Sequence, residues 1–301
     1  MDDFARLFDV SGLSLDRLRT FLRVVEAGNL AKAAKGDPTK QSQFSRQIKE
    51  LEGFFGVALS RRVGRRIEIT EEGQRLSLVI RRHFRELDDF REAMSGRCVS
   101  IRFGSQGSVI NWMLIPQLDQ IRATLGNVTV ELEQMRSGEV VRAVVDGRVD
   151  FGIVREDAAP AELQRWPLGK VGYAMFAENR LWQDHPSTEK LVQSVPCAGL
   201  LGGGQFSERW DEWLAKQGLV PKVAARVSSF LDLARVVQAG RAAAVLPDLA
   251  AVDFDPARFS YRLIPALRAR KLVLIANPRS LQRAGVATGI AATLAALLRL
   301  Q

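Results

Sequence analysis

The stretch Lys40–Leu51, with the sequence KQSQFSRQIKEL, constrains the fold of this chain more than any other segment. Wound as a helix of about 3.6 residues per turn, it places Phe44, Ile48 and Leu51 on one apolar stripe. The other side holds hydroxyls and cations and no carboxylate, which on an isolated helix would indicate an ordinary solvated face. The residues of this polar face are Ser42, Ser45, Arg46 and Lys49, with Gln41 at its margin.

The residues before this helix predict a helix-turn-helix. Apolar residues at helical spacing indicate a first helix that begins at Leu15 and that Gly28-Asn29 ends. A short alanine-rich helix is expected over 30–35, and Gly36-Asp37-Pro38 separates it from the helix at Lys40. Two helices joined by a short turn, the second with a face of hydroxyls and cations, predict that the second helix lies in a DNA major groove.

Arginines surround a tight turn just downstream. The segment Ile67–Ile69 alternates like a short strand, so we expect a two-stranded wing whose tip carries Arg62 and Arg65 toward phosphate or the minor groove. Between residues 32 and 66 the chain holds nine cations and three carboxylates. The local excess of six positive charges is more than half of the net charge of +9 of the whole chain. The charge favours a polyanionic partner at this end of the chain.

Four short motifs, each at the expected distance from the next, are similar to those of a known protein family. They are A-x-A-A, S-R-Q-I-K-x-L-E, F-G-V-x-L and I-T-x-x-G, and they span residues 15–73. This stretch resembles the winged helix-turn-helix of the LysR-type transcriptional regulators. The chain departs from the family pattern at Asp37, Lys40 and Ser42, so the local turn between the helices and the DNA sequence preference do not carry over.

A long helix is expected over 74–96. Its apolar residues are spaced four and three apart, which makes a heptad seam with charge on both flanks, and this pattern favours a self-pairing helix over a helix that lies on its own domain. In the resembled family this is the linker helix that dimerises the DNA-binding domains. The residues expected to pair are Leu76, Ile80, Leu87 and Phe90.

From residue 97 onward, strands and helices alternate, which implies parallel sheets with right-handed crossovers. Charged, small and proline residues collect at 155–160, and we expect the chain to cross there from lobe I (97–156 and 270–301) to lobe II (157–269). The fold class is therefore α/β with a winged, all-α N-terminal domain (1–73, of which 1–12 is an extension). The C-terminal part resembles the two-lobed effector domain of the same family, which is similar to type 2 periplasmic binding proteins.

Ligands of such folds bind at the carboxyl ends of the strands. Polar and glycine residues follow those ends in both lobes, and free N–H groups at helix starts favour anionic groups, although serine and glycine are also ordinary caps and turns. We expect a small, carboxylate-bearing effector whose charge is met mainly by N–H dipoles and hydroxyls. The residues expected to line the cleft are Ser105, Gln106, Gly107, Ser108, Ser137, Gly202, Gly203, Ser229 and Phe230.

Other classes of protein fit less well. No spacing of His, Cys and carboxylates predicts a metal site, no nucleophile or phosphate-loop motif appears, and no cofactor is expected, so we do not expect an enzyme. Redox sensing through Cys98 and Cys197 is an alternative, but the two cysteines fall in different lobes beside apolar strand residues, which favours buried structural cysteines.

The sequence thus predicts a cytoplasmic DNA-binding regulator with no membrane segment or signal peptide. Its expected partners are double-stranded DNA, a small-molecule effector and a second copy of itself, and the resemblance implies further assembly into a tetramer. Two alternatives stay open. One is a solute-binding protein, which the N-terminal domain argues against, and the other is a DNA-binding protein whose effector domain no longer responds to a ligand.

Overall fold

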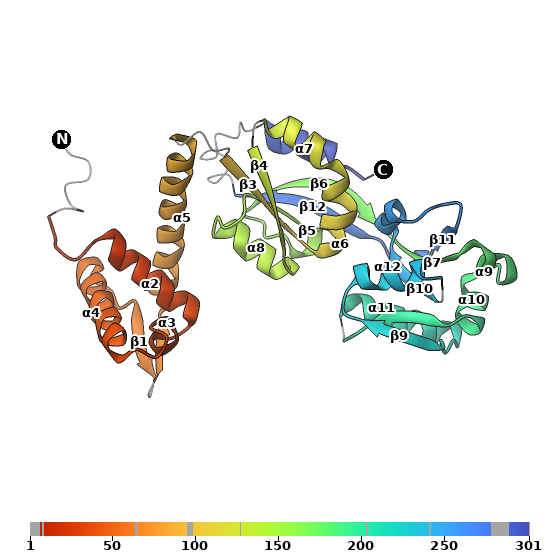
Figure 1. Cartoon of the computed structure of the whole chain (residues 1–301), viewed down its shortest axis with the longest axis horizontal. Helices are drawn as coiled ribbons and strands as arrows, with labels where there is room; N and C mark the ends of the chain where they lie inside the picture. The colour runs from red at the N-terminus through yellow and green to blue at the C-terminus, as the bar shows by residue number, and fades with distance from the viewer. Residues whose placement is uncertain are drawn as a thin grey trace. The chain divides into compact units, whose positions relative to one another are not determined.

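The computed structural model describes residues 7, 9–63, 66–94, 99–126, 128–202, 204–240, 242–277 and 289–300. They form two compact units, one N-terminal to residue 97 and one that holds the rest of the chain apart from a short segment at 146–148. Figure 1 shows the helices of the first unit and the two sheets of the second.

The N-terminal unit is a helix-turn-helix followed by a two-stranded wing and a long helix, as the sequence predicted. Antiparallel pairing of β1 with β2 makes the wing. The elements are α2 (Leu15–Ala27), α3 (Leu30–Ala33), α4 (Pro38–Phe55), β1 (Ser60–Val63), β2 (Arg66–Ile69) and α5 (Glu71–Met94).

Local capping explains where the helices begin and end. Helix α4 starts at Pro38, two residues before the predicted start, because the carboxylate of Asp37 accepts hydrogen bonds from the N–H groups of Thr39 (2.9 Å) and Lys40 (3.2 Å). Helix α3 stops at Ala33, short of the predicted residue 35, and Lys35 then adopts a left-handed φ of 53°. The turn between the helices is thus fixed by Asp37, one of the positions where the chain departs from the family pattern.

An apolar core holds the described part of the N-terminal unit together. The stripe Phe44, Ile48 and Leu51 is buried in it, as predicted, against α2. Ile80 of α5, with a side chain only 3% exposed, belongs to the same core, and Leu76 packs against it. Burial of these apolar side chains joins α5 firmly to the domain that it follows.

The heptad seam of α5 therefore divides into two parts. Ile80 is buried in its own domain, so the prediction that it faces a second copy is wrong, and Leu76 is half-buried there. The exposed apolar residues of α5 lie at one side of the helix at spacings of eight, three and four: Val79, Leu87, Phe90 and Met94. Pairing through Leu87 and Phe90 stays a prediction, with Val79 in the place of Ile80.

The second unit holds two five-stranded sheets. Lobe I has the strand order β4-β3-β5-β12-β6, and lobe II has the order β11-β7-β10-β8-β9. In each lobe four strands run in the same direction, and one strand, β12 in lobe I and β7 in lobe II, runs antiparallel to them. The strands are β3 (Val99–Ser105), β4 (Val128–Gln134), β5 (Phe151–Arg155), β6 (Gln164–Val171), β7 (Tyr173–Glu178), β8 (Cys197–Leu200), β9 (Val223–Val227), β10 (Ala243–Pro247), β11 (Phe259–Leu263) and β12 (Arg270–Ala276).

Helices cover both faces of each sheet and bury separate cores on them. In Figure 1, α7 and α8 lie beside the sheet of lobe I, and α11 and α12 beside that of lobe II. The helices are α6 (Gly107–Val109), η1 (Ile110–Leu114), η2 (Ile115–Gln117), α7 (Leu118–Leu125), α8 (Ser137–Val145), η3 (Glu156–Ala158), α9 (Asn179–Asp184), α10 (Thr188–Ser194), α11 (Gln205–Gln217), α12 (Phe230–Gln238), η4 (Asp248–Asp253), η5 (Pro265–Leu267) and α14 (Ile290–Leu297).

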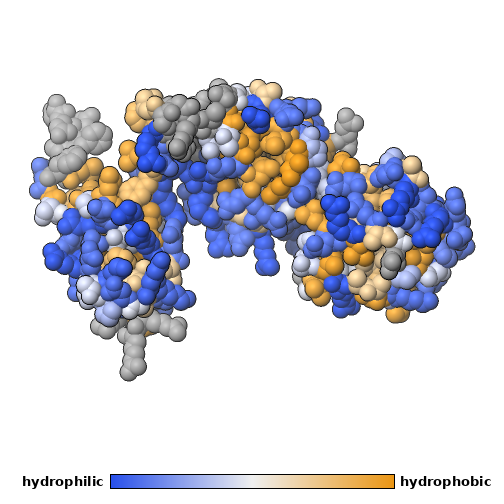
Figure 2. Space-filling view, in the orientation of Figure 1, coloured by the Kyte–Doolittle hydropathy of each residue, from blue (hydrophilic) through white to orange (hydrophobic). Residues whose placement is uncertain are grey.

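The chain crosses between the lobes later than the sequence indicated. Strand β6 pairs with β12 in the sheet of lobe I, so the segment to Val171 belongs to lobe I, and the boundary predicted at residue 157 is wrong. The crossing lies at Gly172, whose N–H donates to the carboxylate of Asp248 (2.8 Å). The chain returns through η5 to β12, which begins at Arg270. Figure 2 shows that hydrophilic residues cover most of the visible face, with hydrophobic residues in separate patches.

Candidate DNA-binding and effector-binding sites

The polar face of α4 points to solvent. Ser42, Arg46 and Lys49 are exposed, and Gln41 and Ser45 are half-buried at the margins of the helix. The buried stripe on the opposite side fixes the rotation of the helix, so all five predicted residues lie on one accessible side. This is the geometry that a helix needs to enter a major groove.

A carboxylate that the sequence analysis left out reaches this face. Glu50 accepts hydrogen bonds from Nε of Arg46 (2.9 Å) and from Nε of Arg17 on α2 (2.5 Å). The bonds from Arg46 and from Arg17 both lower the pKa of Glu50, which is charged at neutral pH. The spacing of four between Arg46 and Glu50 is the signal that could have revealed the pair. Glu50 thus links the guanidinium of Arg46 to a second helix.

Glu52 attaches the wing to α4. Its Oε1 accepts hydrogen bonds from the N–H groups of Leu59 and Ser60, both at 2.9 Å, where β1 begins. Arg62 lies in β1, and Arg65, predicted for the tip of the wing, is outside the described residues. The wing therefore starts from a fixed point on α4.

The carboxyl edge of the sheet of lobe I brings the predicted serines together, but in different roles. The side chain of Ser105 is fully buried, and its hydroxyl donates to the carbonyl of Ile153 (2.8 Å). Because this hydroxyl is shielded from solvent, the expectation that it lines the cleft is wrong, and its role is to hold the turn. Gln106 is exposed, and its amide donates to the hydroxyl of Ser137 (3.3 Å), which joins the turn after β3 to the turn after β4.

The remaining residues of these turns are half-buried. Ser108 lies in the first turn of α6. Gly107 lies close to the side chain of Gln134, and a Cβ at Gly107 would come within 2.9 Å of the amide oxygen of Gln134. Gln134 is exposed and the contact involves only the end of its flexible side chain, so this side chain could move aside for a Cβ at Gly107.

In lobe II the residues predicted to bind the effector also have different roles. Gly202 is exposed at a left-handed φ of 81°, and Gly203 is outside the described residues. The hydroxyl of Ser229 caps α12, since it accepts from the N–H of Asp232 (3.1 Å) and donates to its carboxylate (2.7 Å). Phe230 packs edge-on against Phe206, with ring centres 5.0 Å apart. These contacts make Ser229 a helix cap and Phe230 part of an aromatic cluster.

Arginines that the sequence analysis did not select meet where the lobes join. Arg155, at the end of β5, donates from Nη1 to the side-chain oxygen of Gln205, the first residue of α11. Arg270, the first residue of β12, holds its guanidinium carbon 5.7 Å from the ring centre of Tyr173. The arginines come from distant parts of the chain, so only the fold places them together.

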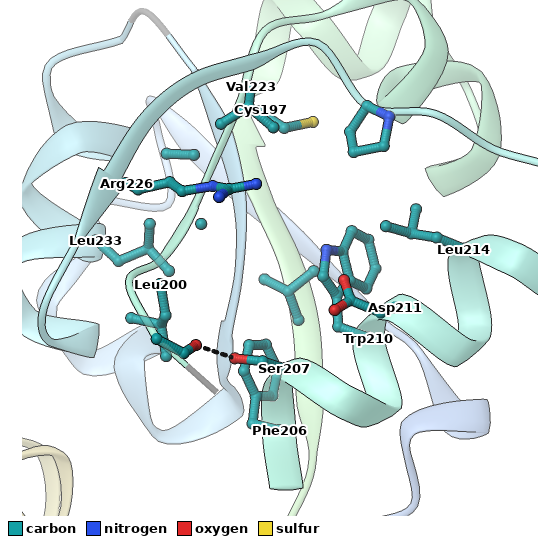
Figure 3. A pocket seen from close by; sticks show the side chains of 15 residues that line it. Cys197, Leu200, Phe206, Ser207, Trp210, Asp211, Leu214, Val223, Arg226 and Leu233 are labelled. Atoms are coloured by element: carbon teal, nitrogen blue, oxygen red, sulfur yellow. Dashed lines mark hydrogen bonds between the residues drawn. The ribbon is translucent and has the colours of Figure 1, made fainter. Parts of the chain in front are cut away.

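A separate pocket of about 310 Å³ lies inside lobe II, between α11 and the strands β8 and β9. Figure 3 shows the aromatic rings of Phe206 and Trp210 on one side and the thiol of Cys197 and the guanidinium of Arg226 on the other. Burial raises the pKa of the Cys197 thiol to about 11, so the thiol is protonated at neutral pH. This agrees with the prediction of a buried structural cysteine at 197; Cys98 is outside the described residues.

Two general properties limit the possible sites. No helix within the described residues is both long enough and apolar enough to cross a membrane. In the same part of the chain, no group of three His, Cys, Asp or Glu side chains could hold a metal ion.

A winged helix-turn-helix joined to a two-lobed α/β domain defines a DNA-binding regulator with an effector domain. Matches to two known domain families identify the family of regulators to which the chain belongs. "Bacterial regulatory helix-turn-helix protein, lysR family" matches residues 15–74, and "LysR substrate binding domain" matches residues 95–297. The chain belongs to the LysR family of transcriptional regulators, and the resemblance seen in the sequence is confirmed.

Known proteins agree with this assignment. The chain is 24% identical to the nitrogen assimilation regulatory protein nac of Escherichia coli K12 over 249 residues, which cover 79% of this chain and 80% of that protein. It is 26% identical to a probable nitrogen assimilation transcriptional activator of Synechococcus elongatus over 265 residues, covering 84% and 83%. The crystal structure of full-length CbnR with its target DNA has a TM-score of 0.56 at 21% identity and covers 93% of this chain and 99% of that one, which shows a shared fold.

Proposed function

We propose that Arg46 and Ser45 of α4 contact base edges or adjacent phosphates, with Gln41, Ser42 and Lys49 at the margins. The observation that carries this proposal is the fixed rotation of α4, which buries Phe44, Ile48 and Leu51 and leaves these polar side chains accessible. Arginine on a base edge contributes roughly 1–3 kcal/mol of discrimination between bases. The wing residues Arg62 and Arg65 act mainly on phosphate, which positions the helix without reading sequence.

The exposed stripe of α5 pairs two copies of the chain. Leu87, Phe90 and Met94 are 56%, 66% and 70% exposed, which is more apolar surface than a solvated helix leaves open. Pairing two DNA-binding units sets two recognition helices roughly 34 Å apart, or a multiple of this distance, on a two-fold symmetric operator. Further assembly into a tetramer would join two such pairs.

The effector domain binds a small molecule that carries a carboxylate, and the binding biases the arrangement of the paired DNA-binding units. Gln106 and Ser137 from lobe I, with the residues that begin α11 in lobe II, are the candidates for its site. A ligand shifts the arrangement only by the difference between its affinities for the two states. The chain acts by binding alone, without catalysis, in keeping with relatives that are named as transcriptional regulators and activators, and it acts where the chromosome lies, in the cytoplasm.

Binding titrations of Arg46→Ala on operator and random DNA test the DNA-binding proposal. The operator affinity should fall roughly 5- to 150-fold, with a smaller change on random DNA. Arg75→Ala is a matched control, because Arg75 also pairs with a glutamate four residues away (2.6 Å to Glu71) but lies outside α4. If Arg46→Ala binds operator as the unchanged protein does, α4 is not the reading element.

A further inference from the structure

The junction between the lobes gathers positive charge from three elements. Arg155 and Arg270 lie on the adjacent strands β5 and β12, where Leu272 pairs with Arg155. Residue 270 lies two positions from 272 and so on the same face of the sheet, which puts the two arginines at diagonal positions on the order of 7–8 Å apart. Both side chains leave the sheet on the face that buries Ile153.

Lobe II adds a third cation to the same place. Gln205, which accepts a hydrogen bond from Arg155, is the first residue of α11. Arg209 follows four residues later and so lies on the same side of that helix as Gln205. Tyr173, beneath Arg270, also contacts Phe206 of α11, with ring centres 4.8 Å apart. The contacts through Gln205 and Phe206 hold this end of α11 against the arginines of lobe I.

Most of this charge lacks a counter-ion. Arg155 is paired with Asp157 (3.4 Å). Arg209 and Arg270 form no ion pair with any residue that the structure describes. Nε and Nη2 of Arg270 are in addition shielded from solvent and have no hydrogen-bond partner among the described residues.

An arginine with shielded, unbonded N–H groups costs stability. Burial is the main cause that lowers the pKa of Arg270; the positive charges of Arg155 and Arg209 also lower it, whereas Tyr173 and Asp157 act in the opposite direction. The flat ring of Tyr173 offsets only part of this cost. A buried polar group without a partner requires an explanation, and a missing ligand is one.

We propose that this junction binds a small organic dianion with two separated anionic groups, one held by Arg270 of lobe I and the other by Arg209 of lobe II. The inference rests on the proposed effector-binding function and names its ligand class. Arg155, already paired with Asp157, orients Gln205 and thereby the start of α11. Two carboxylates match two guanidinium groups in bidentate geometry. The dianion also removes the repulsion between the lobes, so its binding favours the arrangement in which both arginines face it.

This differs from the effector site expected from the sequence. The sequence predicted that backbone N–H groups and hydroxyls would bind one carboxylate of the effector. Ser105 is buried and Ser229 caps α12, so neither hydroxyl can take that role as predicted. The arginines supply the charge instead.

The test is isothermal titration of the full chain with four sets of probes. They are linear dicarboxylates of two to six carbons, the matching monocarboxylates, simple phosphate monoesters and linear diamines. A dicarboxylate should bind most tightly. Arg270→Gln and Arg209→Gln should each weaken that binding about 10- to 100-fold, because each removes a charged hydrogen-bonding partner. Arg226→Gln, a change in the separate pocket of lobe II, should leave it unaltered.

A second readout separates a ligand contact from a structural role. Without ligand, Arg270→Gln should melt at the same temperature as the unchanged protein or higher, because it removes a shielded cation that has no counter-ion. A lower melting temperature together with unaltered dicarboxylate affinity would show that Arg270 only supports Tyr173. Tighter binding of a phosphate monoester, a monocarboxylate or a diamine, or the absence of any binding by a dicarboxylate, would also overturn the proposal.

Failure of this inference can be distinguished from failure of the proposed function. If some other small molecule alters operator binding and Arg270→Gln keeps that response, the chain is an effector-controlled regulator and only the dianion site is wrong. If Arg46→Ala keeps full operator affinity, the DNA-binding proposal fails whatever the arginines of the junction do.

Discussion

Substitutions at two apolar positions of α5 should have opposite effects, one on the stability of the domain and the other on the pairing of two copies. Ile80 is 3% exposed in the core of its own domain, whereas Leu87, two turns later, is 56% exposed. Ile80→Ala should cost the N-terminal unit about 2–5 kcal/mol, since it removes buried methyl groups and leaves a cavity. In a unit of this size, the loss lowers the melting temperature by roughly 10 °C or more.

Leu87→Glu should behave in the opposite way. An exposed position contributes within about 0.5 kcal/mol to the stability of its own domain, so the melting temperature should hardly change. A carboxylate on the exposed stripe should however prevent two helices from pairing, so DNA with two half-sites should bind no more tightly than DNA with one. Gln74→Glu introduces the same charge on the opposite side of α5 and should preserve pairing.

Two measurements decide between these effects. Circular dichroism melts report the stability of each variant, and titrations on one- and two-site DNA report pairing. If Ile80→Ala abolishes pairing without lowering the melting temperature, or if Leu87→Glu unfolds the domain, then the division of the seam between core and pairing surface is wrong.

Three further predictions follow from individual contacts. Glu50→Gln removes the carboxylate that holds Arg46, so random DNA should bind more tightly and the ratio of operator to random affinity should fall; an unchanged ratio in titrations would refute the link. The Cys197 thiol, with its pKa near 11, should resist iodoacetamide at pH 7 in the folded protein and react only after unfolding, as mass spectrometry can show. Arg258 and Arg180 lower the pKa of Glu178 from its ordinary 4.5, so its contribution to stability is complete above that pH and is lost as the pH falls through the folded-state value; Glu178→Gln should therefore flatten the acid limb of stability, and a limb as steep as before would contradict this.

The sequence predicted the recognition helix well because its pattern is local. The positions of Phe44, Ile48 and Leu51 repeat at helical spacing, and that repeat alone determines which side of α4 is buried. The sequence could not separate Ile80 from Leu87, since both fit one heptad seam and only the packing of α5 against α2 decides which is covered.

The parts that were missed depend on pairing between distant segments. Strand β6 contains Pro167 and Gly169, which interrupt the alternation of a strand, and it is held in place by β12, about a hundred residues later. The arginine junction likewise needs β5, α11 and β12 to meet. Because its arginines lie on three separate elements, their spacing along the sequence follows no pattern that could be recognised.

Selection of DNA fragments by the full chain, followed by sequencing, tests the central claim most directly. The account predicts that the unchanged protein enriches an inverted repeat with half-sites one helical turn apart or a multiple of it, and that Arg46→Ala enriches no such repeat while Gln74→Glu enriches the same one. Equal enrichment by the unchanged protein and Arg46→Ala would contradict the claim that the polar face of α4 reads DNA.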